Sequence, residues 1–132
     1  MGTSRKEAVR QCGRWLLLAC WIGVILAIGG TTAFAETGAI VRWLLRKSVH
    51  ILEYGVLGFL LWWTTADRTR DRGRWQVSFG VAMAIVIAGL DEWRQTRIAG
   101  RAGELADVGL DAVGGTLGVA VAWLWHNAPK GQ

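Results

Sequence analysis

The residues of this chain that could carry out chemistry gather at the ends of long apolar stretches. They are Lys47, His50, Glu53 and Tyr54 at the start of one stretch, Asp91, Glu92 and Gln95 at the end of the next, and Arg101, Asp107 and Asp111 before the last. We call these ten residues the polar cluster. Ionisable groups at membrane depth are costly, so they usually mark a functional site.

The first members of the polar cluster share one side of a predicted helix. Lys47, His50 and Tyr54 fall at positions i, i+3 and i+7, and Glu53 borders their stripe. A histidine beside an excess of carboxylates can titrate in the physiological range and transfer a proton. A single histidine more often serves only as a hydrogen-bonding residue, and the sequence leaves both roles open.

The charges of the polar cluster do not balance. Lys47 and Arg101 are two cations against five carboxylates, at positions 53, 91, 92, 107 and 111. The excess must be protonated, solvated or matched by a bound cation or cationic ligand. The alternative is an ion-pair network, in which the two cations join the carboxylates at 91, 92 or 107 and hold the helix ends together.

Four apolar stretches must position these residues, and 52% of the 132 residues are hydrophobic. A helix needs about 20 apolar residues to cross a bilayer. We predict an all-α, four-helix transmembrane bundle with short loops, in one domain over residues 1–132. The expected spans are 15–35, 49–66, 75–92 and 107–125, with helices that continue into their polar flanks. A soluble bundle is the alternative, but little polar helix surface remains for it.

The basic residues predict the orientation of the bundle. With four spans, nine of the 15 Lys and Arg residues fall on the side of both termini and six on the other. The positive-inside rule therefore places both termini in the cytoplasm. The net charge of +5 then reflects topology and anionic lipid rather than nucleic acid.

Tryptophans are expected to form belts at the two membrane interfaces. The inner belt would contain Trp15, Trp62, Trp63, Trp75, Trp123 and Trp125, and the outer belt Trp43 and Trp93. We expect Trp21 to fill lipid-facing surface.

Three segments allow further predictions. Residues 38–47 have helical spacing and form either an interfacial helix or an early start of the second span. Ala33-Phe34-Ala35 after the first apolar run resembles a signal-peptide cleavage site, which is the alternative to a retained first span. Gly114 and Gly118 form a small stripe that lets another helix approach, which would make the fourth helix the central one.

Three motifs resemble the VanZ-like family of small four-helix membrane proteins. Lys47-Ser48-Val49-His50 with Tyr54 is similar to its K-x-x-H-x-x-x-Y, and Asp91-Glu92-Trp93-Arg94-Gln95 to its D-E-x-x-Q. Arg101, Asp107, Gly114 and Gly118 are similar to its R, D, N, G, G series. The resemblance covers about residues 45–120. Asp111 stands where the family usually has Asn, and Ala99 where a Pro often precedes Gly-Arg.

The resemblance implies an integral protein of the bacterial cytoplasmic membrane, linked to resistance to the glycopeptide teicoplanin. We expect its polar cluster to form a pocket on the extracytoplasmic side for the headgroup of a membrane lipid or a lipid-linked cell-wall precursor. The hydrogen-bond donors would be Lys47, His50, Tyr54, Gln95 and Arg101, oriented by the acidic neighbours Asp91, Glu92, Asp107 and Asp111. No cofactor, structural metal or nucleic acid is expected, and the oligomeric state stays open.

An enzyme is the second interpretation of the same residues. Asp91, Glu92, Asp107 and Asp111 would hold a divalent cation, with His50 as general acid or base on a lipid-linked phosphate or ester. The candidate catalytic residues are then His50, Asp91 and Glu92. A transporter or proton-coupled channel is the third interpretation, although the inner halves of all four spans are apolar.

Overall fold

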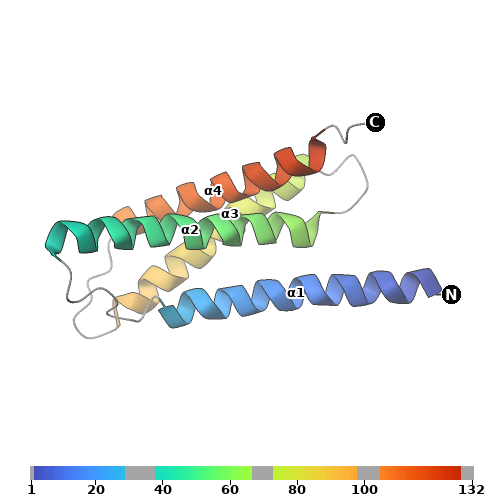
Figure 1. The fold of residues 1–132 in the computed structure, drawn as a ribbon, viewed down its shortest axis with the longest axis horizontal. Coiled ribbons are helices and arrows are strands. Elements are labelled where there is room, and N and C mark those ends of the chain that lie inside the picture. Colours follow the sequence, from blue (N-terminus) through green and yellow to red (C-terminus); the bar gives the residue numbers. More distant parts are fainter. Residues whose placement is uncertain (1, 29–37, 67–72, 98–104, 129–132) are drawn as a thin grey trace.

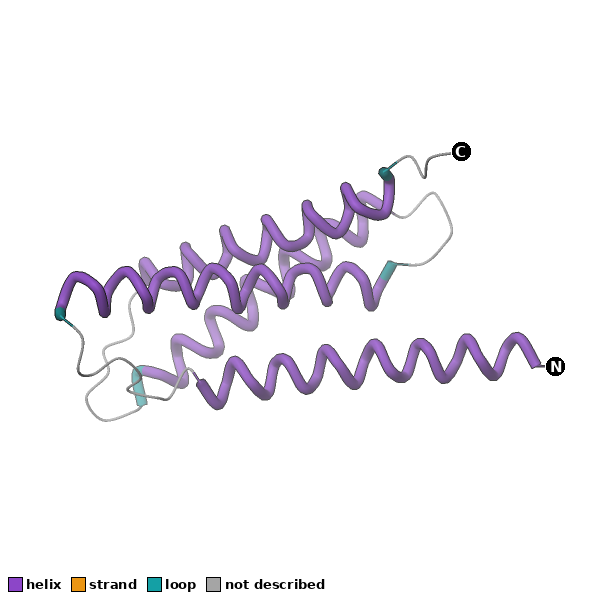
Figure 2. The backbone as a smooth tube through the Cα atoms, in the orientation of Figure 1, coloured by secondary structure: helices purple, strands orange, loops and turns teal. Residues whose placement is uncertain are grey.

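The computed structural model describes residues 2–28, 38–66, 73–97 and 105–128 and consists there of four α-helices (Figures 1 and 2). They are α1 (Gly2–Ile28), α2 (Ala39–Thr65), α3 (Gly73–Gln95) and α4 (Leu105–Asn127). The predicted all-α fold is confirmed. Each helix extends beyond its apolar stretch into polar flanks on at least one side, as a membrane span of this composition requires.

The segment before the second apolar stretch belongs to α2. That helix begins at Ala39 and continues without interruption to Thr65, so residues 39–47 are an early start of the second span and not a separate interfacial helix. As a result, Lys47 and His50 lie in the interior of a 27-residue helix and not in a loop.

The helices run alternately in opposite directions (Figure 1). The N-terminus of α1 and the C-terminus of α4 lie at one end of the bundle, which we call the terminal end. The starts of α2 and α4 and the C-terminus of α3 lie at the opposite end, which we call the polar end. The three parts of the polar cluster therefore reach the same end, as the four-span prediction requires.

Three of the helices are long and apolar enough to cross a membrane, over Arg5–Ala27, Trp75–Gln95 and Leu105–Asn127. Many large apolar side chains on these helices are exposed, among them Leu16, Leu17, Val24, Val86, Leu117, Val121 and Leu124. A soluble bundle would present this apolar surface to water, whereas a bilayer covers it. The chain is therefore a multi-pass membrane protein.

The central helix is α2, and not α4 as we predicted from the glycine stripe. α2 packs against each of the other three helices, most extensively against α4. It is also the helix that falls short of the apolar character of a membrane span, because its first half carries Arg42, Arg46, Lys47, His50 and Glu53. Packing against other helices accommodates Lys47, His50 and Glu53, which are buried or partly buried, whereas Arg46 is exposed.

Glycines bring α2 and α4 into backbone contact midway along the bundle. A Cβ atom on Gly118 would overlap the carbonyl oxygen of Gly55, and one on Gly58 would overlap the carbonyl oxygen of Gly115. A Cβ atom on Gly114 would lie 2.6 Å from the carbonyl oxygen of Ile51. The stripe on α4 thus has the packing role that we predicted for it.

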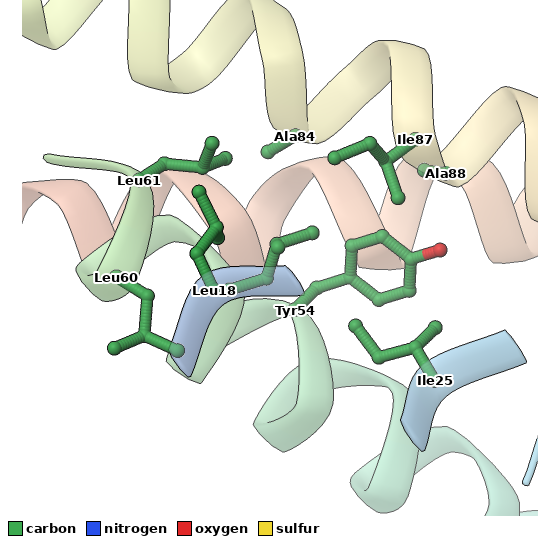
Figure 3. Close-up of a cluster of buried hydrophobic side chains, with 9 residues drawn as sticks. Leu18, Ile25, Tyr54, Leu60, Leu61, Ala84, Ile87 and Ala88 are labelled. Carbon is green, nitrogen blue, oxygen red and sulfur yellow. The ribbon is translucent and has the colours of Figure 1, made fainter. Parts of the chain in front are cut away.

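The first helix joins the bundle through one side. Leu18 and Ile25 of α1 are buried in a core cluster with Tyr54, Leu57 and Ala88, part of which Figure 3 shows. The indole nitrogen of Trp21 donates a 3.0 Å hydrogen bond to the backbone oxygen of Glu53, so Trp21 is not the purely lipid-facing residue that we expected. Ala33-Phe34-Ala35 lies outside the described residues.

Side chains from two neighbouring helices cap the C-terminus of α2. The Gln11 amide donates a 2.8 Å hydrogen bond to the Thr64 oxygen, and the Gln76 amide donates one of 3.0 Å to the Thr65 oxygen. Arg14 donates a longer bond, of 3.3 Å, to the Trp63 oxygen. These donors satisfy carbonyl groups that the end of a helix leaves without intrahelical partners.

Candidate functional site

The polar cluster is assembled from three helices at the polar end. α2 supplies Lys47, His50, Glu53 and Tyr54, α3 supplies Asp91, Glu92 and Gln95, and α4 supplies Asp107 and Asp111. All of these residues are buried except Lys47 and Glu53, which are partly buried. Arg101 lies outside the described residues. The alternating topology therefore gathers nine of the ten residues that the sequence singled out.

Two pairs of side chains join α2 to α4. The Lys47 ammonium group forms an ion pair with Asp107. One turn further along both helices, Nδ1 of His50 lies 3.0 Å from Oδ1 of Asp111. The first pair is one of the contacts that the ion-pair interpretation named, and both fix the register of α2 against α4.

A third group of contacts lies within the end of α3. The Gln95 amide donates a 2.7 Å hydrogen bond to Oδ2 of Asp91. The Arg94 guanidinium donates to Oδ1 of the same carboxylate, at 2.8 and 3.1 Å. Arg94 was not among the predicted site residues, although its i, i+3 spacing from Asp91 was a visible signal for this pair. Arg94 therefore supplies part of the missing positive charge.

Some oxygens of the polar cluster are buried without a hydrogen-bond partner among the described residues. The Tyr54 hydroxyl and Oδ2 of Asp111 are among them. Tyr54 is fully buried, and Asp111 is 1% exposed. In Figure 3 the Tyr54 ring lies near Ile25 and Ala88, with its hydroxyl on the side away from Leu60 and Leu61. The contacts between the helices therefore leave these two oxygens able to form further hydrogen bonds inside the polar cluster.

The model of the VanZ/LLP1 family matches residues 14–126, which is most of the chain and includes the whole polar cluster. The chain belongs to the VanZ/LLP1 family. No curated protein and no solved structure matches it. The match extends on both sides of the motif region at residues 45–120, so α1 from Arg14 onward is also part of the VanZ/LLP1 region.

The enzyme interpretation requires side chains arranged to bind a divalent cation in this VanZ/LLP1 protein. Among residues 2–28, 38–66, 73–97 and 105–128, no group of three or more His, Cys, Asp and Glu side chains is arranged to hold a metal ion. Asp91, Asp107 and Asp111 instead accept bonds from Arg94, Lys47 and His50. A metal would have to displace these partners.

The tryptophans divide between the surface and the interior. Trp43 and Trp93 are exposed near the polar end, and Trp15, Trp75, Trp123 and Trp125 are also exposed, as belt residues should be. Trp62 is only 3% exposed, which corrects its assignment to the inner belt. Its burial gives this VanZ/LLP1 protein an aromatic contact between α2 and α4 at the terminal end.

Proposed function

We propose that the polar cluster binds the headgroup of a membrane lipid or of a lipid-linked cell-wall precursor. In this proposal the protein lies in the bacterial cytoplasmic membrane with both termini in the cytoplasm, so that the polar end reaches the outer leaflet. The division of Lys and Arg residues between the two sides supports this orientation. The link of the VanZ family to glycopeptide resistance supports a ligand in the cell envelope.

The observation that carries the proposal is the pair of buried oxygens without partners, on Tyr54 and Asp111. Leaving such a group unsatisfied costs about 1–3 kcal/mol, and folded proteins rarely do so. A hydroxyl group can donate a hydrogen bond to Oδ2 of Asp111 and accept one from Tyr54. Sugars and glycerol headgroups carry such hydroxyls, which makes them suitable ligands.

In this proposal the ion pair between Lys47 and Asp107 lies at the entrance to the binding site. The Lys47 side chain is 12% exposed and lies nearer to the end of the bundle than His50 and Tyr54. A phosphate or carboxylate on the ligand can replace Asp107 as the partner of Lys47, because both form charge-assisted hydrogen bonds with an ammonium group. Such an exchange opens the α2–α4 contact without leaving a buried cation alone.

The Tyr54→Phe variant separates a binding role from a structural one. It removes the hydroxyl and keeps the ring in the core. We expect unfolding stability to stay equal or to rise, since an unsatisfied polar group is lost. We expect affinity for the headgroup to fall about tenfold, the loss of one hydrogen bond of about 1.4 kcal/mol.

Native mass spectrometry of the purified full chain measures this affinity. The probes are a polyprenyl-diphosphate-linked muropeptide and a neutral glycosyl diacylglycerol, and glycopeptide susceptibility of cells is a second measurement. Trp93→Phe is the matched control, because that aromatic residue is exposed near the same end. If wild type binds neither probe, or if Tyr54→Phe binds as wild type does, the proposal is wrong.

A further inference from the structure

A cavity at the terminal end lies away from the polar cluster. It has a volume of about 230 Å³ and lies between the last turns of α2 and α4. Its walls are Phe59, Trp62, Trp63, Ala122, Trp125 and His126. The glycine contact holds the two helices together midway along the bundle, and the bulky aromatic side chains keep them apart beyond it.

Aromatic rings form the walls of the cavity in two pairs across the helices. Phe59 and Trp125 stack with ring centroids 5.8 Å apart, and Trp62 meets His126 edge to face at 5.1 Å. The indole nitrogen of Trp62 is buried and has no hydrogen-bond partner among the described residues. A buried indole N–H usually finds an acceptor, so this donor indicates a ligand that carries an oxygen atom.

The charge beside the cavity is positive. The Arg14 guanidinium lies 4.6 Å from the ring centroid of Trp63, which is one of the cavity walls. Arg5, Lys6 and Arg10 precede it on the same helix and are exposed. These cations disfavour an ammonium ligand in the aromatic cavity and favour an anion. Tryptophans and basic residues occur together at the depth of phospholipid esters and phosphates.

We propose that this cavity binds an anionic phospholipid. The start of an acyl chain lies against the aromatic walls, and an ester or phosphate oxygen accepts the hydrogen bond of the Trp62 indole. The phosphate group faces Arg14. Binding requires the edge-to-face contact between Trp62 and His126 to open. The site shares no residue with the polar cluster and lies at the other end of the bundle, so it is independent of the function proposed above.

Native mass spectrometry of the full chain in detergent tests the lipid site. The probes are phosphatidylglycerol, phosphatidylcholine with the same acyl chains, and glycerol 3-phosphate, which carries the anion without the chains. We expect wild type to bind phosphatidylglycerol at least tenfold more tightly than either of the other two. Equal binding of the two lipids, or equal binding of glycerol 3-phosphate, overturns the proposal.

Two variants separate the hydrogen bond from the charge. Trp62→Phe removes the indole N–H and should weaken phosphatidylglycerol binding about tenfold, as expected for one hydrogen bond. Arg14→Gln keeps a donor for the Trp63 oxygen and should abolish the preference for phosphatidylglycerol over phosphatidylcholine. If Trp62→Phe fails to fold, Arg14→Gln decides the result by itself.

Matched controls for both variants lie elsewhere on the chain. Trp75→Phe changes an exposed tryptophan outside the cavity walls, and Arg46→Gln removes an exposed arginine from the first half of α2. Both should bind phosphatidylglycerol as wild type does. A loss in these controls equal to the loss in Trp62→Phe and Arg14→Gln shows a nonspecific effect and contradicts the site.

Discussion

Replacing Gly118 with alanine should lower the free energy of unfolding by about 3 kcal/mol, the upper part of the usual range for an overfilled core. The added Cβ atom would overlap the carbonyl oxygen of Gly55. Because the obstacle is backbone and not a flexible side chain, α2 and α4 must move apart. Their separation weakens van der Waals packing, which drives helix association in a membrane. Denaturant unfolding in detergent, followed by circular dichroism, measures the change.

Gly109 provides the control for this prediction on the same helix. It is exposed, and no atom lies within 4 Å of the position that its Cβ atom would occupy. Gly109→Ala should leave stability equal or raise it by up to about 1 kcal/mol, because alanine is the better helix former. Equal losses in Gly109→Ala and Gly118→Ala would mean that the α2–α4 glycine contact does not hold the bundle together.

Replacing Asp107 with alanine should be the most destabilising single change in the polar cluster, at about 3–5 kcal/mol. The substitution takes the carboxylate from its ion pair with Lys47 and leaves that cation with less compensation at a largely buried position. Removing one partner of a buried pair costs more than replacing both by apolar residues. The double variant Lys47→Met with Asp107→Leu should therefore recover most of the lost stability.

A double-mutant cycle on Lys47 and Asp107 measures the coupling between them directly. We expect the two single changes to be strongly non-additive, and we expect the double variant to lose headgroup binding even though it folds. If Asp107→Ala lowers the free energy of unfolding by less than about 1 kcal/mol, the ion pair contributes no more than an exposed surface pair does. That result would contradict a buried ion pair at the entrance of the site.

Much of the fold could be predicted because the apolar stretches fix the number of helices. With alternating directions, four helices must bring residues 47–54, 91–95 and 107–111 to one end. The need for about 20 residues to cross the bilayer also predicted that helices extend into polar flanks, which placed His50 and Asp111 within α2 and α4. Gly114 and Gly118 predicted a close helix contact because glycine permits backbone approach.

The ion-pair alternative named the contact between Lys47 and Asp107. The other partners could not be predicted, because spacing along one helix does not determine which face meets which neighbour. The stripe on α4 was visible, but its partners Gly55 and Gly58 on α2 were not recognised. The central position of α2 also escaped prediction. The glycine stripe pointed to α4, whereas α2 is the helix that packs against all three others.

The tryptophans show the same limit. Interface belts are an average tendency, and each ring can instead pack inward where two helices diverge. Trp62 does so, and its indole nitrogen is buried at the terminal end. Trp21 likewise uses its indole nitrogen to bind the α2 backbone at Glu53 instead of the membrane interface. Neither contact follows from the amino-acid type alone, because both depend on how helices cross.

Cysteine labelling of intact cells tests most directly whether the polar residues of three helices share one outward-facing end. In a variant without Cys12 and Cys20, single cysteines replace exposed residues at the starts of α2 and α4 and after α3, at Ile40, Leu105 and Thr96. Two more replace Trp75 and Asn127 at the terminal end. A membrane-impermeant maleimide should label the first three from outside and the last two only after permeabilisation. If Ile40, Thr96 and Leu105 divide between the two sides, the helices do not alternate as described and the polar cluster does not form an outer headgroup site.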